Sequence, residues 1–143
     1  MSFTNSFSYV IITFFLATLT LTPCSEATHV EWTQWHNVHI VNGFYSNDKP
    51  LNIHCKSKDD DLGDHSLWNG QESRFHFGLN FWHSTLFSCD MTWGTQQKHI
   101  NVFDTPAETP LACMENEECF WLVTEDGFFI STDNKNWIRQ LDW

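Results

Sequence analysis

Five cysteines carry the most specific chemistry in this sequence. They could bind zinc or form disulfides, and they are Cys24, Cys55, Cys89, Cys113 and Cys119. Structural zinc sites use closely spaced pairs of ligands, and no Cys-x-x-Cys pair occurs here. Disulfides persist in oxidising compartments and join cysteines in even numbers. The choice between the two therefore depends on whether the chain is exported and whether one cysteine is then removed.

Residues 1–27 are typical of a secretory signal peptide. Residues 10–21 form an apolar run that is shorter than the about 18 to 20 residues of a membrane-spanning helix. Ser25 and Ala27 are small residues at the positions that signal peptidase reads, so we predict cleavage after Ala27. The mature chain, residues 28–143, would lack Cys24 and keep four cysteines. Four cysteines predict two disulfides, and the sequence leaves three pairings open.

The other reactive side chains do not form a recognisable site. Asp59, Asp60 and Asp61 are adjacent carboxylates, whereas a calcium-binding loop needs acidic residues at alternate positions. The eight histidines are scattered and include no His-x-x-x-His pair. His54 and Cys55 are neighbours on a predicted strand, where adjacent side chains point to opposite faces and cannot readily share a proton. We predict no catalytic residue, no metal site and no cofactor.

The charge of the chain excludes some classes of partner. The sequence has 18 acidic against 7 basic residues, a formal net charge of −11, and the basic residues form no stripe. Binding of nucleic acid or of an anionic membrane requires clustered Lys and Arg. We therefore predict neither a nucleic-acid partner nor membrane insertion of the mature chain. A length of 143 residues indicates one domain after the signal peptide, residues 28–143.

Short apolar alternations separated by turn residues predict an all-β fold. Asn-Gly and Asp-Gly pairs mark turns, and no segment shows helical periodicity over ten residues. About seven strands at close spacing favour a small antiparallel β-sandwich, stapled by the two disulfides. The strand patterns lie within residues 38–40, 51–56, 75–79, 85–93, 100–102, 119–123 and 128–130.

One stretch, residues 51–63, combines a strand with a charged loop. Leu51, Ile53 and Cys55 alternate with polar residues and predict a half-buried strand. Six polar residues follow and have no apolar face to bury, which predicts an exposed loop. The charged residues of this candidate partner-binding loop are Lys56, Lys58, Asp59, Asp60 and Asp61.

Aromatic residues are expected to fill the core of so small a domain, because each can bury about 150 to 250 Å². The predicted core aromatics are Phe75, Phe77, Phe87, Trp93 and Trp121. An alternative role is an exposed platform for carbohydrate. The candidates for that platform lie near the ends of the mature chain and are Trp32, Trp35, Trp137 and Trp143.

Three linked motifs resemble the plant self-incompatibility S1 family, also called the S-protein homologues. They are HCKSKDDDLG at residues 54–63, TLFSC at 85–89 with Trp93, and CFW at 119–121 leading to DGF at 126–128. The resemblance covers the chain from Val38 onward. It implies a small secreted plant protein with a β-sandwich fold and two disulfides. It also implies that the polar loop after the second strand, here Lys56 to Asp61, is a recognition surface.

The resemblance further implies an extracellular ligand, since the family includes the stigma determinant of poppy self-incompatibility, a ligand for a pollen membrane protein. We therefore predict a secreted, apoplastic, monomeric protein that is not an enzyme. It would signal by binding a plant cell-surface protein in reproduction, development or defence. The alternative is a secreted carbohydrate-binding or inhibitory defence module, which an exposed patch of Trp side chains would distinguish from a ligand with a charged loop.

Overall fold

The computed structural model describes residues 34–79, 85–105 and 111–143. The predicted signal peptide and its cleavage site lie outside the described residues. The described part contains nine strands and one short helix. They are β1 (Gln34–Asn42), β2 (Leu51–Lys56), β3 (Asp61–Leu67), β4 (Glu72–Leu79), β5 (Leu86–Trp93), β6 (Gln96–Asp104), α2 (Leu111–Glu115), β7 (Glu118–Thr124), β8 (Gly127–Ser131) and β9 (Ile138–Leu141).

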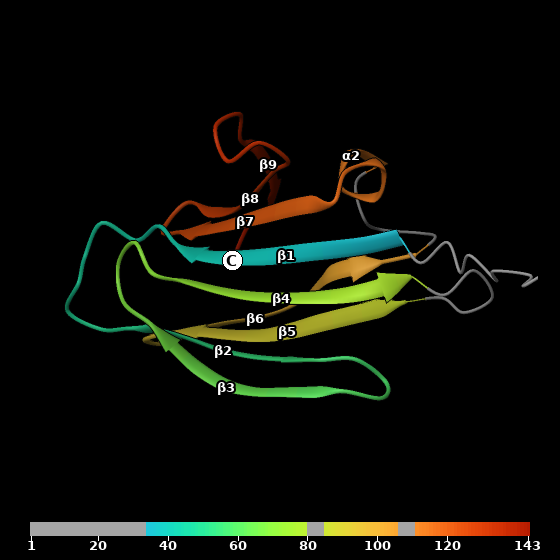
Figure 1. Ribbon diagram of the computed structural model, residues 1–143. Coiled ribbons are helices and arrows are strands. Elements are labelled where there is room, and N and C mark those ends of the chain that lie inside the picture. Colours follow the sequence, from blue (N-terminus) through green and yellow to red (C-terminus); the bar gives the residue numbers. More distant parts are fainter. Residues whose placement is uncertain (1–33, 80–84, 106–110) are drawn as a thin grey trace, which may run out of the picture. The chain divides into compact units, whose positions relative to one another are not determined.

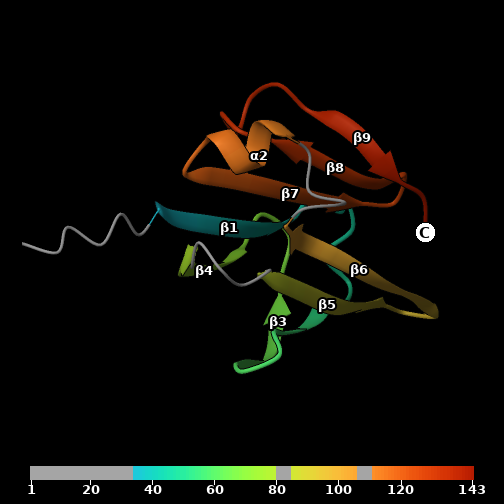
Figure 2. The same cartoon turned by 90° about the vertical axis from the view of Figure 1, so that its right-hand side faces the viewer.

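The strands form two sheets, which confirms the predicted β-sandwich. One sheet has the strand order β4-β1-β7-β8-β9 and the other the order β3-β2-β5-β6, and Figures 1 and 2 show them as two layers. All the strand pairs are antiparallel except β1 and β7, which pair in parallel. Strands β3 and β9 account for the difference between the nine strands described and the about seven predicted.

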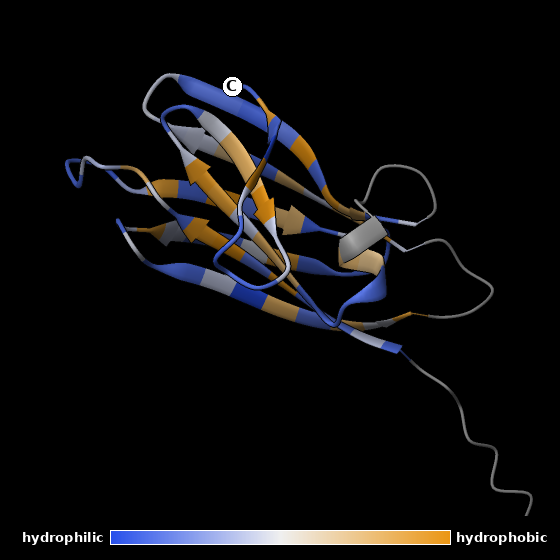
Figure 3. Cartoon of the chain, turned by 90° about the horizontal axis from the view of Figure 1, so that it is seen from above, coloured by the Kyte–Doolittle hydropathy of each residue, from blue (hydrophilic) through white to orange (hydrophobic). Residues whose placement is uncertain are grey.

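Alternating residues supply the core between the sheets. Val38 and Ile40 of β1 are fully buried, as are Cys89 of β5 and Val123 of β7. Figure 3 shows the corresponding bands of hydrophobic and hydrophilic residues along the strands. This alternation is what a sheet with one buried and one solvated face requires.

The aromatic residues predicted for the core occupy it to different degrees. Phe87 and Trp121 are 4% and 3% exposed, while Phe75, Phe77 and Trp93 are partly buried and pack against the core. Trp121 lies on β7 and donates its indole N–H to the carbonyl oxygen of Val102 on β6, at 3.0 Å. Since β6 and β7 belong to different sheets, this bond satisfies a buried donor and links the two layers.

The four cysteines of the described chain form two disulfides, Cys55–Cys89 and Cys113–Cys119. Cys55 on β2 and Cys89 on β5 are paired in register, with their Cα atoms 4.1 Å apart. Cys113 on α2 bonds to Cys119 on β7, so the second disulfide ties the helix to the next strand. The prediction of two disulfides is confirmed, and the structure resolves which of the three pairings is used.

The predicted turn at Asp126-Gly127 connects β7 to β8. Gly127 has a φ of 126°, which L side chains rarely adopt. A Cβ atom there would also overlap the carbonyl oxygen of Leu141. Both observations explain why the hairpin needs glycine at this position.

Candidate functional site

The charged loop predicted after the second strand connects β2 to β3. Lys56 is the last residue of β2 and Asp61 the first of β3, and the two pair in register, so the loop proper is residues 57–60. Ser57 holds the loop in a compact turn. Its hydroxyl accepts the backbone N–H of Asp60 at 3.0 Å, and its own N–H donates to the carbonyl oxygen of Asp60 at 2.7 Å. The exposed charges of Asp59 and Asp60 are therefore displayed from an ordered backbone.

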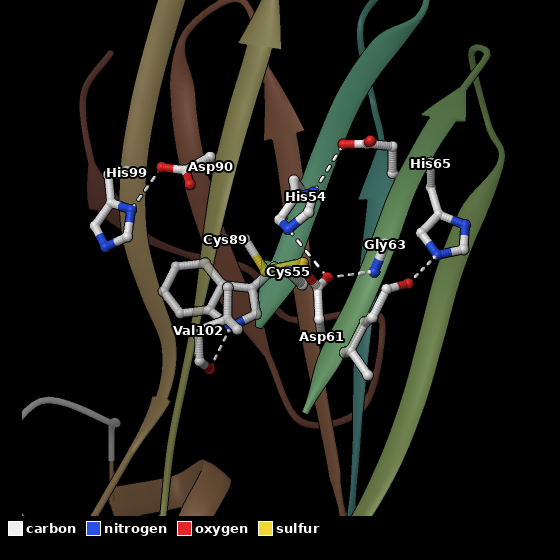
Figure 4. Close-up of a disulfide and its surroundings, with 12 residues drawn as sticks. His54, Cys55, Asp61, Gly63, His65, Cys89, Asp90, His99 and Val102 are labelled. Carbon is white, nitrogen blue, oxygen red and sulfur yellow. Dashed lines mark hydrogen bonds and ion pairs between the residues drawn. A yellow bond between two sulfur atoms is a disulfide. The ribbon is translucent and has the colours of Figure 1, made fainter. Parts of the chain in front are cut away.

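The disulfide Cys55–Cys89 lies next to this loop, because Cys55 directly precedes Lys56 at the end of β2. Figure 4 shows the disulfide together with His54 and Asp61. His54, one residue before Cys55, points to the solvent side of the sheet. Its Nε2 atom lies 3.1 Å from an Asp61 carboxylate oxygen and its Nδ1 atom 2.8 Å from one of Asp64. The base of the loop is thus fixed by a covalent bond on the core side and by ion pairs on the outer side.

A groove of about 660 Å³ adjoins the loop. It is lined by residues 56–60, by residues 77–78 of β4 and by residues 85–88 at the start of β5. Its apolar lining includes Phe77, Phe87 and Leu86, of which Leu86 is 43% exposed. The arrangement offers a partner an apolar contact beside four charged side chains, which is the usual composition of a protein-binding surface. The loop is visible in the sequence but the groove is not, because β4 and β5 meet the loop only in the folded sandwich.

The outer face of the four-stranded sheet carries a row of alternating acids and histidines. In register across β3, β2, β5 and β6 the row runs Asp64, His54, Asp90, His99. The hydrogen bond to Asp64, together with the charge of Asp61, raises the pKa of His54 above its usual value. The hydrogen bond from His99, at 2.7 Å, lowers the pKa of Asp90.

A shallow depression of about 320 Å³ on this face brings two histidines together. His54 and His65 both line it, with Asp64 and Asp90. Both ring nitrogens of His54 lie against carboxylates, and His65 Nε2 lies 3.1 Å from the carbonyl oxygen of Leu62. The histidines are therefore engaged by the protein itself, and the surrounding carboxylates oppose binding of an anionic substrate such as a phosphodiester. Among the described residues, no group of three or more His, Cys, Asp or Glu side chains is placed to hold a metal ion.

The tryptophans proposed as a carbohydrate platform do not gather on one surface of the described chain. Trp35 is 56% exposed on β1, and Trp137 is half-buried. Trp143 packs on Phe128 with ring centroids 4.8 Å apart and donates its N–H to the carbonyl oxygen of Thr124 at 2.7 Å. Trp32 lies outside the described residues.

Comparisons with known proteins agree with this fold. A sequence profile described as plant self-incompatibility protein S1 matches residues 37–143. The chain belongs to the plant self-incompatibility S1 family. It is 30% identical to S-protein homolog 18 of Arabidopsis thaliana over 131 residues, which are 92% of this chain and 91% of that protein. The resemblance inferred from the motifs is therefore confirmed.

Other members of the S1 family match shorter stretches. S-protein homolog 5 of Arabidopsis thaliana is 41% identical over 78 residues, 54% of this chain and 58% of that protein. The Self-incompatibility protein S1 of Papaver rhoeas is 30% identical over 83 residues, 58% of this chain and 59% of that protein. The chain thus spans less than two thirds of the length of both of these relatives.

A solved structure shares the fold. It represents SPH (Self-Incompatibility Protein Homologue) proteins, described as a widespread family of small, highly stable, secreted proteins from plants. The TM-score is 0.56, the sequence identity is 15%, and the match covers 78% of this chain and 96% of the other. Membership of the S1 family makes the present protein a secreted, extracellular one, as predicted. Within the described residues, no helix is long and apolar enough to cross a membrane.

Proposed function

We propose that the protein is a non-catalytic extracellular signalling ligand that binds a plant cell-surface protein, in reproduction, development or defence. Its mature form begins after Ala27. Membership of the S1 family supports a role outside the cell, and the name of the Papaver rhoeas relative supports a role in recognition between cells. The function is proposed for this chain by analogy with that relative.

The observation that carries the proposal is the ordered, charged loop at residues 57–60 beside the groove. A binding loop gains affinity when its bound shape is already formed, because less conformational entropy is lost on association. The Ser57 hydrogen bonds and the Cys55–Cys89 disulfide supply that order. Lys58, Asp59 and Asp60 then provide charge complementarity to the partner, and the apolar groove lining takes up its buried contacts.

Two further features support a monomeric, non-catalytic protein. A net charge of −11 for the full chain makes copies of the protein repel one another. Both ring nitrogens of His54 lie against carboxylates, so this side chain is poorly placed to exchange protons with a substrate. The dispersed tryptophans give the carbohydrate-binding alternative no comparable surface.

The triple substitution Lys58→Ser/Asp59→Ser/Asp60→Ser tests the proposal. Labelled mature protein is titrated onto protoplasts of several plant tissues, pollen tubes included, with excess unlabelled protein as competitor. We expect saturable binding whose affinity falls at least about tenfold in the triple variant, because central charged contacts contribute strongly to specific recognition. Unchanged affinity would eliminate the loop as the contact surface. The matched control is Glu115→Ser/Glu117→Ser, which removes two exposed carboxylates elsewhere and should bind normally.

A further inference from the structure

The end of the sandwich opposite the 57–60 loop carries the most exposed large aromatic side chain of the described residues. Tyr45 lies in the β1–β2 connection and is 87% exposed. It is surrounded by the β3–β4 turn and the β7–β8 hairpin, which Figure 1 shows at the same end of the two sheets. We call this surface, made of residues 43–50, 68–71 and 125–126, the Tyr45 end.

The backbone of the Tyr45 end is pinned by hydrogen bonds between its segments. The Tyr45 N–H donates to a carboxylate oxygen of Glu125 at 2.8 Å. The side chain of Asn69 donates to the carbonyl oxygen of Phe44, and the Asn69 N–H donates to Asn47 Oδ1 at 3.0 Å. The β1–β2 connection is therefore joined to each of the other two, although they are far apart in the sequence.

The buried side chain of Asn42 fixes the β1–β2 and β3–β4 connections from the core side. Asn42 is 0% exposed, and its side chain donates to the carbonyl oxygen of Leu67 at 2.7 Å and accepts the N–H of Phe44 at 2.9 Å. Phe44 is itself fully buried and stacks on Trp93 with ring centroids 4.2 Å apart. Phe44 is thus fixed in the core, and the next residue, Tyr45, has its side chain in solvent.

An exposed aromatic side chain on a fixed backbone has a recognisable use. Tyrosine supplies a large amphipathic contact area with little side-chain entropy to lose, which makes it a frequent anchor of protein-binding surfaces. At 87% exposure, nearly the whole Tyr45 side chain is open to contact by a partner. Trp68, 43% exposed in the adjoining turn, adds a second aromatic to the same end.

The charges around Tyr45 indicate the chemistry of the partner. Asp48 and Asp126 are exposed, and the Ser46 hydroxyl lowers the pKa of Asp48. The nearby cations are engaged within the chain. Lys49 lies 4.1 Å from the ring centroid of Trp93, and Arg139 donates to the Asp126 carbonyl oxygen at 2.6 Å. Within residues 43–50, 68–71 and 125–126, the acidic Asp48, Glu125 and Asp126 outnumber the single cation Lys49. This excess of negative charge disfavours a second copy of the chain and favours a positively charged surface.

We propose that the Tyr45 end is a second protein-binding surface, at which Tyr45 enters a pocket on a partner protein rimmed by Lys or Arg side chains. Eight-residue strands such as β5 separate the two ends by roughly 26 Å. One protein bound at the 57–60 loop would leave the Tyr45 end open, so the ligand could bridge two cell-surface proteins.

The test uses the labelled mature protein and its Tyr45→Ala, Tyr45→Phe and Trp35→Ala variants on the same protoplasts. Trp35→Ala is the matched control, because Trp35 is an exposed aromatic, 56%, at the other end of β1. We expect the Kd to rise at least about tenfold for Tyr45→Ala and less than about threefold for the other two variants. Binding by the wild type should weaken as salt rises from about 0.05 to 0.15 M and disappear after protease treatment of the protoplasts.

Three results would overturn the proposal. The first is an unchanged Kd for Tyr45→Ala in a variant with the wild-type melting temperature. The second is binding that survives protease treatment and is displaced by soluble cell-wall glycans, which would identify a carbohydrate partner. The third is no saturable binding to any of the protoplasts. The loop triple variant tests the proposed function separately. If the triple variant loses binding and Tyr45→Ala binds normally, only the second surface is refuted. If Tyr45→Ala loses binding and the triple variant binds normally, only the loop is refuted.

Discussion

Removing the Cys55–Cys89 disulfide should destabilise the protein more than removing Cys113–Cys119. The first bond joins residues 34 positions apart and the second residues 6 apart. The entropy of closing these loops in the unfolded chain predicts losses of about 3.8 and about 2.2 kcal/mol, respectively. The four cysteines are 0–3% exposed, so substituting each pair with alanine leaves similar gaps in the core. The difference of about 1.5 kcal/mol should therefore reflect loop length.

The comparison requires the variants Cys55→Ala/Cys89→Ala and Cys113→Ala/Cys119→Ala. Unfolding by guanidinium chloride at neutral pH, followed by tryptophan fluorescence, gives the free energy of unfolding of each variant and of the oxidised wild type. Refolding from denaturant checks that the transition is reversible. If the Cys113–Cys119 variant loses as much stability as the other or more, then restriction of the unfolded chain does not determine the contribution of these bonds.

Three further predictions concern single residues. Asn42→Ala should lower the free energy of unfolding by about 2 to 4 kcal/mol, because it leaves two buried backbone groups without partners; a loss below about 0.5 kcal/mol in guanidinium unfolding would contradict this. Gly127→Ala should cost about 2 kcal/mol or more, through its φ and the overlap with Leu141, and a melting temperature equal to that of the wild type would count against it. The raised pKa of His54 means that its ion pairs stabilise the fold below about pH 6.5 and cease to do so as the pH rises through the raised value. His54→Asn should therefore destabilise the protein more at about pH 5.5 than at about pH 8.5, and equal losses at both would show that the pairing with Asp64 does not affect folding.

The strands that the sequence predicts are those with one buried face. Strands β2, β5 and β7 alternate cleanly because their inward residues form the core. Strand β3 contains Asp61, Gly63 and Asp64 and lies at a sheet edge, so few of its residues need to be apolar. Strand β9 is exposed throughout, also at an edge. The sequence predicts neither β3 nor β9, because apolar residues alternate along a strand only where one face is buried. Edge strands with little burial lack that alternation.

The candidate surfaces, like the strands, could be predicted only in part. The loop at residues 57–60 is visible in the sequence as an uninterrupted polar run. The groove beside it and the Tyr45 end are not, because each is assembled from connections that only the sandwich topology brings together. Disulfide pairing remained open for the same reason, since the register of β2 on β5 decides it.

The parallel pairing of β1 with β7 has a consequence for the order in which the protein can fold. Asn37 and Glu118, paired across these strands, are 81 residues apart. A chain entering the secretory pathway from its N-terminus therefore exposes one edge of β1 until β7 has been synthesised. Strand β2 can pair with β3 earlier, and β5 with β6, because the two strands of each pair are near one another in the sequence. Chaperones of the endoplasmic reticulum would thus meet a half-built sandwich whose open edge is β1, and truncations before residue 118 should be retained there rather than exported.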